Sequence, residues 1–346
     1  MLGILGIIFL SILCTVKVHW KGIDENYLSK KYTQPIKGIF IIIVFLSHIR
    51  TYTNFESKGD LFTIGVLNYL GQLMVALFLF YSGYGIYEAI KSKGNTYIES
   101  LLKNRFGKTF FDFGLAIILF VIVNACLGQF YPLSRILLSF IGWSSVGNSA
   151  WYMFAIFTLY ILSYICFSLF KNIKYGRFVS ICLLSACSLG YVYIFSIIKD
   201  NYWSSTYLCF AAGMWYSFFK EYIDKILKDK VFLYYISMIF IMVSYNYLFT
   251  MRYRRLLMFN LVAILFCFIF VFLSMKLSIH SKFLTWMGEH LFWVYILQRI
   301  PMLVLQHIGV ADKYPYMYLY VCFVITIILA HYINILAGKL KQKIWN

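Results

Sequence analysis

Long runs of apolar residues alternate with short polar stretches along nearly the whole chain. A membrane-spanning helix needs about 20 predominantly apolar residues, and the runs that meet this need are 2–18, 36–52, 64–89, 109–131, 149–170, 177–198, 203–219, 231–250, 256–275, 285–307 and 316–337. The alternation predicts an all-α fold, a polytopic integral membrane helix bundle with about 11 transmembrane helices.

The composition supports this class. Of the 346 residues, 62% are hydrophobic, 21% are aromatic and only 13% are charged, which excludes a soluble globular domain. The largest polar connections, 20–35, 90–108 and 132–148, are too short to be domains, so we expect any chemistry to take place inside the bundle. The eight cysteines have no spacing typical of a zinc site, and we expect no metal and no disulfides.

The formal net charge of +18 is distributed unevenly. Lysines and arginines gather in alternate connections, and the positive-inside rule places these in the cytoplasm, the N-terminus outside and the C-terminus in the cytoplasm. The charge is therefore a topology signal, and nucleic acid is not an expected partner. Arg252, Arg254 and Arg255 are the exception on the outer side. Two partners are open for this cluster: membrane lipid headgroups, or an anionic sugar polymer or lipid-linked glycan.

Lys37 and His48 lie eleven residues apart in one apolar run. In a helix this spacing puts both side chains on the same face, about 16 Å apart along the axis. An ionisable residue inside a membrane helix is costly and indicates a functional site that faces protein or water. The alternative is a histidine that bonds to a neighbouring helix for packing alone.

Several segments match, in order, the motifs of a known family. They are the Lys37-to-His48 pair, 79–84 (Leu-Phe-Tyr-Ser-Gly-Tyr), 103–106 (Lys-Asn-Arg-Phe), 151–153 (Trp-Tyr-Met), 210–214 (Phe-x-x-Gly-Met) and 284–298 (Leu-x-x-Met-Gly to Tyr-Ile-Leu-Gln). Each is weak alone, but their order and spacing are specific. With them the chain resembles acyltransferase family 3, integral membrane enzymes that acylate envelope sugars.

The resemblance implies an architecture and an activity. Residues 1–35 would form an additional N-terminal transmembrane helix and a cytoplasmic loop, 36–337 a ten-helix membrane acyltransferase domain and 338–346 a cytoplasmic tail. The enzyme would be an O-acetyltransferase of a bacterial plasma membrane. Its donor would be acetyl-CoA from the cytoplasm, and its acceptor a hydroxyl of a cell-surface polysaccharide or lipid-linked glycan.

The resemblance also assigns roles to residues. His48 would be catalytic, either as general base on a sugar hydroxyl or in forming an acyl-enzyme. Lys37, Lys103 and Arg105 would hold the phosphates of coenzyme A, with its pantetheine arm running through the bundle toward His48. Gln298 stands where many members have histidine, so it is not expected to be catalytic.

Three further residues are candidates for substrate binding. Ser82 either permits close helix packing, together with its neighbour Gly83, or is an acylated nucleophile. Trp151 begins the Trp-Tyr-Met segment. Arg299 lies deep in its run, and a buried arginine needs an anion or a carbonyl group as partner unless it extends outward to the interface.

Two other classes of protein remain alternatives. A glycan transporter, flippase or polysaccharide polymerase without coenzyme A chemistry would show inverted repeats or helices broken near the midplane, whereas the four prolines mostly lie at the ends of the runs. A non-catalytic scaffold or receptor would give no reason for the alignment of Lys37 with His48. The oligomeric state is open.

Overall fold

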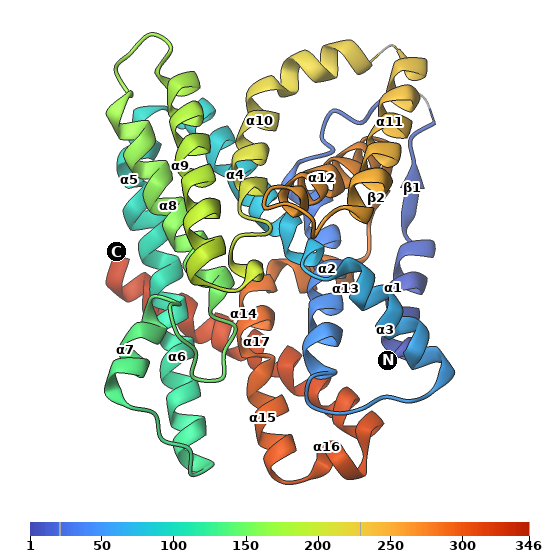
Figure 1. Ribbon diagram of the computed structural model, residues 1–346, viewed down its shortest axis with the longest axis vertical. Helices are drawn as coiled ribbons and strands as arrows, with labels where there is room; N and C mark the ends of the chain where they lie inside the picture. The colour runs from blue at the N-terminus through green and yellow to red at the C-terminus, as the bar shows by residue number, and fades with distance from the viewer. Residues whose placement is uncertain (21, 229, 346) are drawn as a thin grey trace.

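A computed structural model describes residues 1–20, 22–228 and 230–345. Its elements in chain order are α1 (Leu2–Leu13), β1 (Val16–Val18), α2 (Lys30–Ile49), α3 (Lys58–Leu70), α4 (Leu73–Lys93), α5 (Asn95–Leu101), the π-helical η1 (Leu102–Gly107), α6 (Lys108–Cys126), α7 (Leu133–Phe140), α8 (Trp151–Leu169), α9 (Gly176–Ile198), the 3-10 turn η2 (Asn201–Trp203), α10 (Leu208–Leu227), α11 (Val231–Thr250), α12 (Met258–Lys276), β2 (Leu277–Ile279), α13 (Lys282–Glu289), α14 (Leu291–Leu297), α15 (Arg299–His307), α16 (Val310–Lys313) and α17 (Pro315–Trp345). The helices form one bundle (Figure 1), which confirms the prediction of an all-α polytopic membrane fold.

Eight described helices are long and apolar enough to cross a membrane. They are α2, α4, the continuous helix from Asn95 to Cys126 that joins α5, η1 and α6, and α8, α9, α11, α12 and α17. The expected count of about 11 is therefore not reproduced among the described residues. The differences lie in the runs 2–18, 203–219 and 285–307.

The run 2–18 is not one continuous helix. Helix α1 ends at Leu13, and at about 1.5 Å per residue twelve residues are too short to span the hydrocarbon core. The chain then forms β1, which pairs antiparallel with β2 so that Val16 lies opposite Ile279 and Val18 opposite Leu277. β-branched valines favour extended backbone, and the partner strand satisfies their backbone groups. The prediction of a single transmembrane helix here is wrong.

The run 285–307 is divided into α13, α14 and α15, with breaks at His290 and Gln298. The run 203–219 becomes α10, which starts at Leu208 and ends at Leu227. The run 64–89 is divided between α3 and α4 at Gly71, whose φ of +47° favours glycine. The breaks in the run 285–307 place His290 and Gln298 at the ends of short helices.

Glycines allow α2 and α13 to pack backbone against backbone. A Cβ added at Gly38 would lie 1.9 Å from the carbonyl oxygen of Leu284, and one at Gly288 would lie 2.0 Å from that of Gln34. Helix α13 is started by Ser281, whose hydroxyl accepts a hydrogen bond from the Leu284 amide at 3.3 Å. This contact holds α2 in place. Helix α2 begins at Lys30, before the predicted run 36–52.

Helices α4 and α10 pack in the same way. A Cβ at Gly83 would lie 2.0 Å from the carbonyl oxygen of Phe210, and one at Gly213 would lie 2.1 Å from that of Phe80. Small residues at such crossings let membrane helices approach closely. The close-packing interpretation of the segment around Ser82 therefore holds for Gly83.

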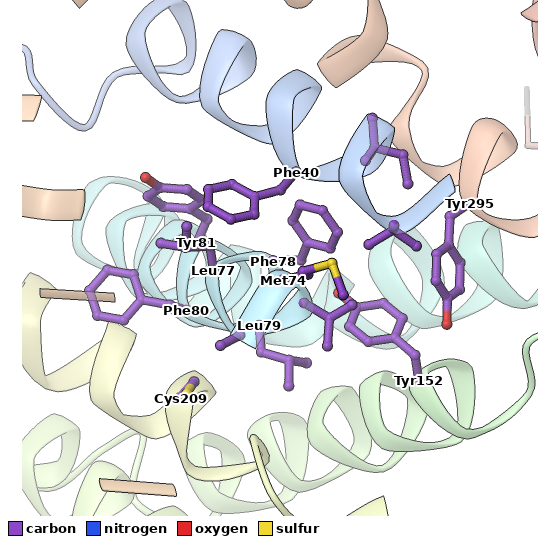
Figure 2. Close-up of a cluster of buried hydrophobic side chains, with 14 of the residues drawn as sticks. Phe40, Met74, Leu77, Phe78, Leu79, Phe80, Tyr81, Tyr152, Cys209 and Tyr295 are labelled. Carbon is purple, nitrogen blue, oxygen red and sulfur yellow. The ribbon is translucent and has the colours of Figure 1, made fainter. Parts of the chain in front are cut away.

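Figure 2 shows the centre of the core around α4. Met74 and Phe78 of α4 are buried there beside Tyr152 of α8 and Tyr295 of α14. Phe78 and Tyr152 of this cluster also line a cavity that contains several predicted site residues.

Candidate active site

The first cavity, named here the Lys37 cavity, has a volume of about 580 Å³ and is lined by residues of α2, α4, η1, α6, α8, α13 and α14. Lys37, Ser82 and Arg105 all line it, so the structure brings together three predicted site residues from distant segments. Lys30 adds another positive charge to its wall. The cavity can therefore accept a negatively charged group.

The cations of this cavity are only lightly engaged by the protein. The Lys37 ammonium lies 5.4 Å from the centre of the Tyr81 ring, and Arg105 donates from Nε to the Tyr97 hydroxyl at 3.0 Å. Among the described residues neither side chain forms an ion pair. The wall also contains Asp112, whose carboxylate pairs with Lys341 of α17 at 2.5 Å.

Lys103 does not line this cavity. It lies in η1, two residues before Arg105, and its side chain is exposed. Lys103 and Arg105 belong to one sequence motif, but two residues along a helix their side chains point in different directions. Of the three predicted phosphate-binding residues, Lys37 and Arg105 line this cavity and Lys103 does not.

The second cavity, named here the His48 cavity, has a volume of about 500 Å³ and is lined by His48, Trp151 and Arg299 among others. These three residues come from α2, α8 and α15, so segments more than one hundred residues apart meet here. Arg299 donates from Nε to the Ser149 hydroxyl at 3.1 Å and from Nη1 to the Tyr52 hydroxyl at 3.4 Å. His48 thus lines a cavity formed by polar and aromatic side chains.

Among the described residues, three buried polar atoms on the wall of the His48 cavity make no hydrogen bond of good geometry, although the Gln298 side chain lies beside the His48 ring. They are Nδ1 of His48, Oε1 of Gln72 and Nδ2 of Asn148. Buried polar groups are nearly always paired in folded proteins, because leaving one unpaired costs about 1–3 kcal/mol. Three such atoms around one cavity indicate a place where a polar ligand completes the hydrogen bonding.

Aromatic rings separate the two cavities. Phe78 and Tyr152 line the Lys37 cavity, and Tyr152 packs edge-on against Tyr295 with ring centres 5.4 Å apart. Tyr295 in turn lies 6.3 Å from the His48 ring. We call Phe78, Tyr152 and Tyr295 the aromatic barrier (Figure 2). The expected open path from Lys37 to His48 is therefore interrupted in this structure.

The three arginines 252, 254 and 255 do not line the His48 cavity. They lie in the connection between α11 and α12, where the Arg252 guanidinium packs over the Phe249 ring at 3.8 Å and donates to the Phe249 carbonyl at 2.8 Å. Arg254 and Arg255 are exposed. The structure gives no support to a role of this cluster in binding a substrate near His48.

Sequence reasoning missed several residues of the His48 cavity. Gln72 and Asn148 each lie in or beside an apolar run, and an unexplained amide in such a place is the signal that indicates them. Trp143, Lys199 and Trp203 come from two connections whose meeting is not visible in the sequence. Lys199 is one of few charges in the connections assigned to the outer side.

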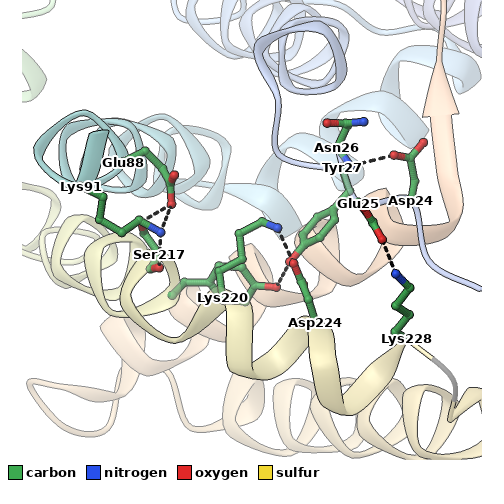
Figure 3. A network of polar contacts seen from close by, with 11 residues as sticks. Asp24, Glu25, Asn26, Tyr27, Glu88, Lys91, Ser217, Lys220, Asp224 and Lys228 are labelled. Carbon is green, nitrogen blue, oxygen red and sulfur yellow. Dashed lines mark hydrogen bonds and ion pairs between the residues drawn. The ribbon is translucent and has the colours of Figure 1, made fainter. Parts of the chain in front are cut away.

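A polar network closes the bundle near the Lys37 cavity (Figure 3). The buried Tyr27 hydroxyl donates to Asp224 of α10 at 2.7 Å and accepts from the Tyr216 hydroxyl at 2.7 Å. Burial raises the pKa of the Tyr27 phenol above its ordinary value, so it keeps the proton that it donates. Glu25 pairs with Lys228 at 2.5 Å. The segment between β1 and α2 is thereby tied to α10.

The fold and the two cavities define a polytopic membrane protein with ionisable side chains in separate chambers of one bundle. The family model described as Acyltransferase domain matches residues 35–334. The chain therefore belongs to acyltransferase family 3 and is a membrane acyltransferase. This membership favours the predicted activity over a transporter, a polymerase or a scaffold. No curated protein and no solved structure matches the chain.

Proposed function

We propose that this acyltransferase moves an acyl group, acetyl in the simplest case, from cytoplasmic acyl-CoA to a hydroxyl of an extracytoplasmic polysaccharide or glycolipid. The enzyme lies in a bacterial plasma membrane with its N-terminus outside and its C-terminus in the cytoplasm. The observation that supports this most directly is that one helix, α2, presents Lys37 to one cavity and His48 to the other.

The Lys37 cavity suits the donor. Its wall contains Lys30, Lys37 and Arg105, which match the phosphates of coenzyme A. The neutral pantetheine arm then lies deeper, along the Ser82 and Tyr160 side chains, whose hydroxyl oxygens are 3.3 Å apart. The thioester points toward the aromatic barrier.

The His48 cavity suits the acceptor. His48 takes the proton of a sugar hydroxyl, and the hydroxyl oxygen attacks the thioester carbonyl carbon. The carbon–sulfur bond then breaks, the coenzyme A thiolate leaves, and an oxygen ester of the sugar forms. An acyl-enzyme would divide this transfer into two steps: a nucleophile of the enzyme first takes the acyl group and releases the coenzyme A thiolate, and the sugar hydroxyl then attacks that acyl carbon and displaces the nucleophile. In either route the rings of the aromatic barrier separate so that the carbonyl reaches the acceptor.

Transfer of labelled acetyl from acetyl-CoA to envelope glycan tests the role of His48. In membrane vesicles from a deletion strain complemented with variants, His48→Ala should lower labelling by about 100-fold or more, the usual contribution of a general base. His307→Ala is the matched control, because His307 is exposed at the end of α15. Undiminished labelling in His48→Ala, at normal protein level, would remove His48 from the mechanism.

Donor binding provides a separate test. Lys37→Ala and Arg105→Ala should each raise the Kd for acyl-CoA, while the dependence on acceptor concentration changes little. Lys93→Ala is the control, since Lys93 is exposed and does not line the Lys37 cavity. If both variants bind acyl-CoA as tightly as the parent protein, the nucleotide lies elsewhere.

A further inference from the structure

The His48 cavity is rich in both indole rings and positive charge. Trp143, Trp151 and Trp203 line it, together with Lys199 and Arg299. These residues come from the connection after α7, the start of α8, η2, the end of α9 and the start of α15. Five segments therefore contribute the same two kinds of side chain to one chamber of about 500 Å³, whose residues a ligand would contact directly.

Lys199 is held between two indole rings. Its ammonium lies 4.0 Å from the centre of the Trp143 ring and 4.7 Å from that of the Trp203 ring, and the two ring centres are 6.1 Å apart. Trp203 is buried and Trp143 is half-buried. Cation–π contacts fix the position of the ammonium but do not neutralise it. Lys199 is thus a fixed positive charge at the edge of the cavity.

Neither cation of the cavity forms an ion pair among the described residues. Within the described part of the chain, Arg299 donates hydrogen bonds to the neutral hydroxyls of Ser149 and Tyr52. Asp200 also lines the cavity but is exposed. The wall therefore contains two positive charges, from Lys199 and Arg299, and one negative charge. A guanidinium with neutral partners favours a carboxylate or phosphate oxygen as ligand.

The rest of the wall matches a sugar ring. Indole faces pack well against apolar C–H surfaces, and ligand sites usually combine such faces with a few convergent polar groups. Gln72 and Asn148 supply the polar groups, since their side chains include the unpartnered buried atoms described above. An amide with an unpaired oxygen or nitrogen can bond to a sugar hydroxyl.

We propose that the His48 cavity selects an acceptor sugar that bears a negative charge, as a carboxylate or a phosphate. The sugar ring packs against Trp143 and Trp151, the anion lies between Lys199 and Arg299, and a hydroxyl faces His48. This inference rests on the proposed function in treating the bound sugar as the acceptor. It goes beyond that function in excluding uncharged sugars as preferred substrates.

Equilibrium binding to the full-length protein in detergent tests the proposal without any transfer reaction. The probes are a uronic-acid oligosaccharide, a phosphate-substituted oligosaccharide and a neutral oligosaccharide of equal length, and the readout is the quenching of tryptophan fluorescence. Both acidic probes, or one of them, should bind about tenfold more tightly than the neutral probe. The acidic probe that binds identifies the source of the charge.

Charge substitutions give the decisive comparison. Lys199→Gln and Arg299→Gln should each weaken binding of the acidic probe by about tenfold and leave the neutral probe unchanged, while Lys199→Arg should retain the preference. Arg254→Gln is the control, an exposed arginine outside the cavity. Equal affinity for acidic and neutral probes, or an unchanged preference in Lys199→Gln, would overturn the proposal.

The two proposals fail separately. If acetyl transfer depends on His48 but the parent protein shows no preference for acidic probes, the charge inference is wrong and the proposed function stands. If the preference is present and depends on Lys199 but no acetyl is transferred, the cavity is an anionic-sugar site and the proposed function is wrong.

Discussion

The contact between α2 and α13 allows a sharp prediction, because α2 carries both Lys37 and His48. In Gly38→Ala the new Cβ would lie 1.9 Å from the Leu284 carbonyl oxygen and 2.8 Å from its carbon. A relaxed carbon–oxygen contact is about 3.3 Å or more, so the helices must separate by roughly 1.4 Å. The obstructing atoms are backbone atoms of a helix, and no side-chain rotation can remove the clash.

The expected cost follows from two opposing effects. Overpacking a core usually costs about 1–3 kcal/mol, whereas replacing glycine by alanine inside a helix gains about 1 kcal/mol. Because the clash is with backbone atoms, the cost lies at the upper end of this range, and the net loss of stability is about 2 kcal/mol, which corresponds to a fall in Tm of about 4–8 °C. Activity should fall further, since a displacement of about 1 Å at a catalytic group can cost about 100-fold.

The measurement is thermal unfolding of the purified protein in detergent, followed by tryptophan fluorescence, together with the acetyl-transfer rate at a temperature where both proteins are folded. Gly190→Ala on α9 is the matched control, because a Cβ there meets nothing within 4 Å. Its Tm should stay equal or rise slightly. If Gly38→Ala has the Tm and the rate of Gly190→Ala, the close approach of α2 and α13 is not as described.

Three other predictions concern stability and topology. Lys341→Met should destabilise the protein by about 1–3 kcal/mol, because it removes the partner that pairs with the Asp112 carboxylate of α6 at 2.5 Å. Lys339→Met is the control, since Lys339 is exposed, and it should leave the Tm unchanged. Tyr27→Phe should cost about 1–3 kcal/mol in thermal unfolding, since one buried hydroxyl makes two hydrogen bonds of 2.7 Å; an unchanged Tm would contradict the network. In a cysteine-free background, Lys58→Cys should react with an impermeant maleimide from outside and Lys93→Cys only after permeabilisation, and the reverse pattern would invert the proposed orientation.

The sequence predicts the helical class, and it names several residues that the structure brings to the two cavities. Apolar runs and the spacing of Lys37 and His48 depend on local helical geometry, which residue order determines directly. The resemblance adds Trp151, the burial of a charged side chain in an apolar run indicates Arg299, and the structure brings both residues to the cavity that contains His48. Local pattern and ordered motifs are therefore enough to find residues that lie on regular helices.

Features that depend on contacts between distant segments were not predictable. The strand at Val16 exists because the backbone after α12 pairs with it, and nothing in the run 2–18 reveals that partner. Lys103 and Arg105 are two residues apart, yet only Arg105 lines a cavity. The position of Lys199 depends on its contact with the Trp143 ring, and Trp143 lies in another connection.

The aromatic barrier has a consequence for the cell that houses this protein. If the Lys37 cavity and the His48 cavity joined into one water-filled pore, ions could cross the membrane along their gradients. Phe78, Tyr152 and Tyr295 are almost fully buried, and a constriction lined by packed rings resists wetting. Under the proposed function the two substrates enter from opposite faces, and these rings keep the membrane electrically insulated between them.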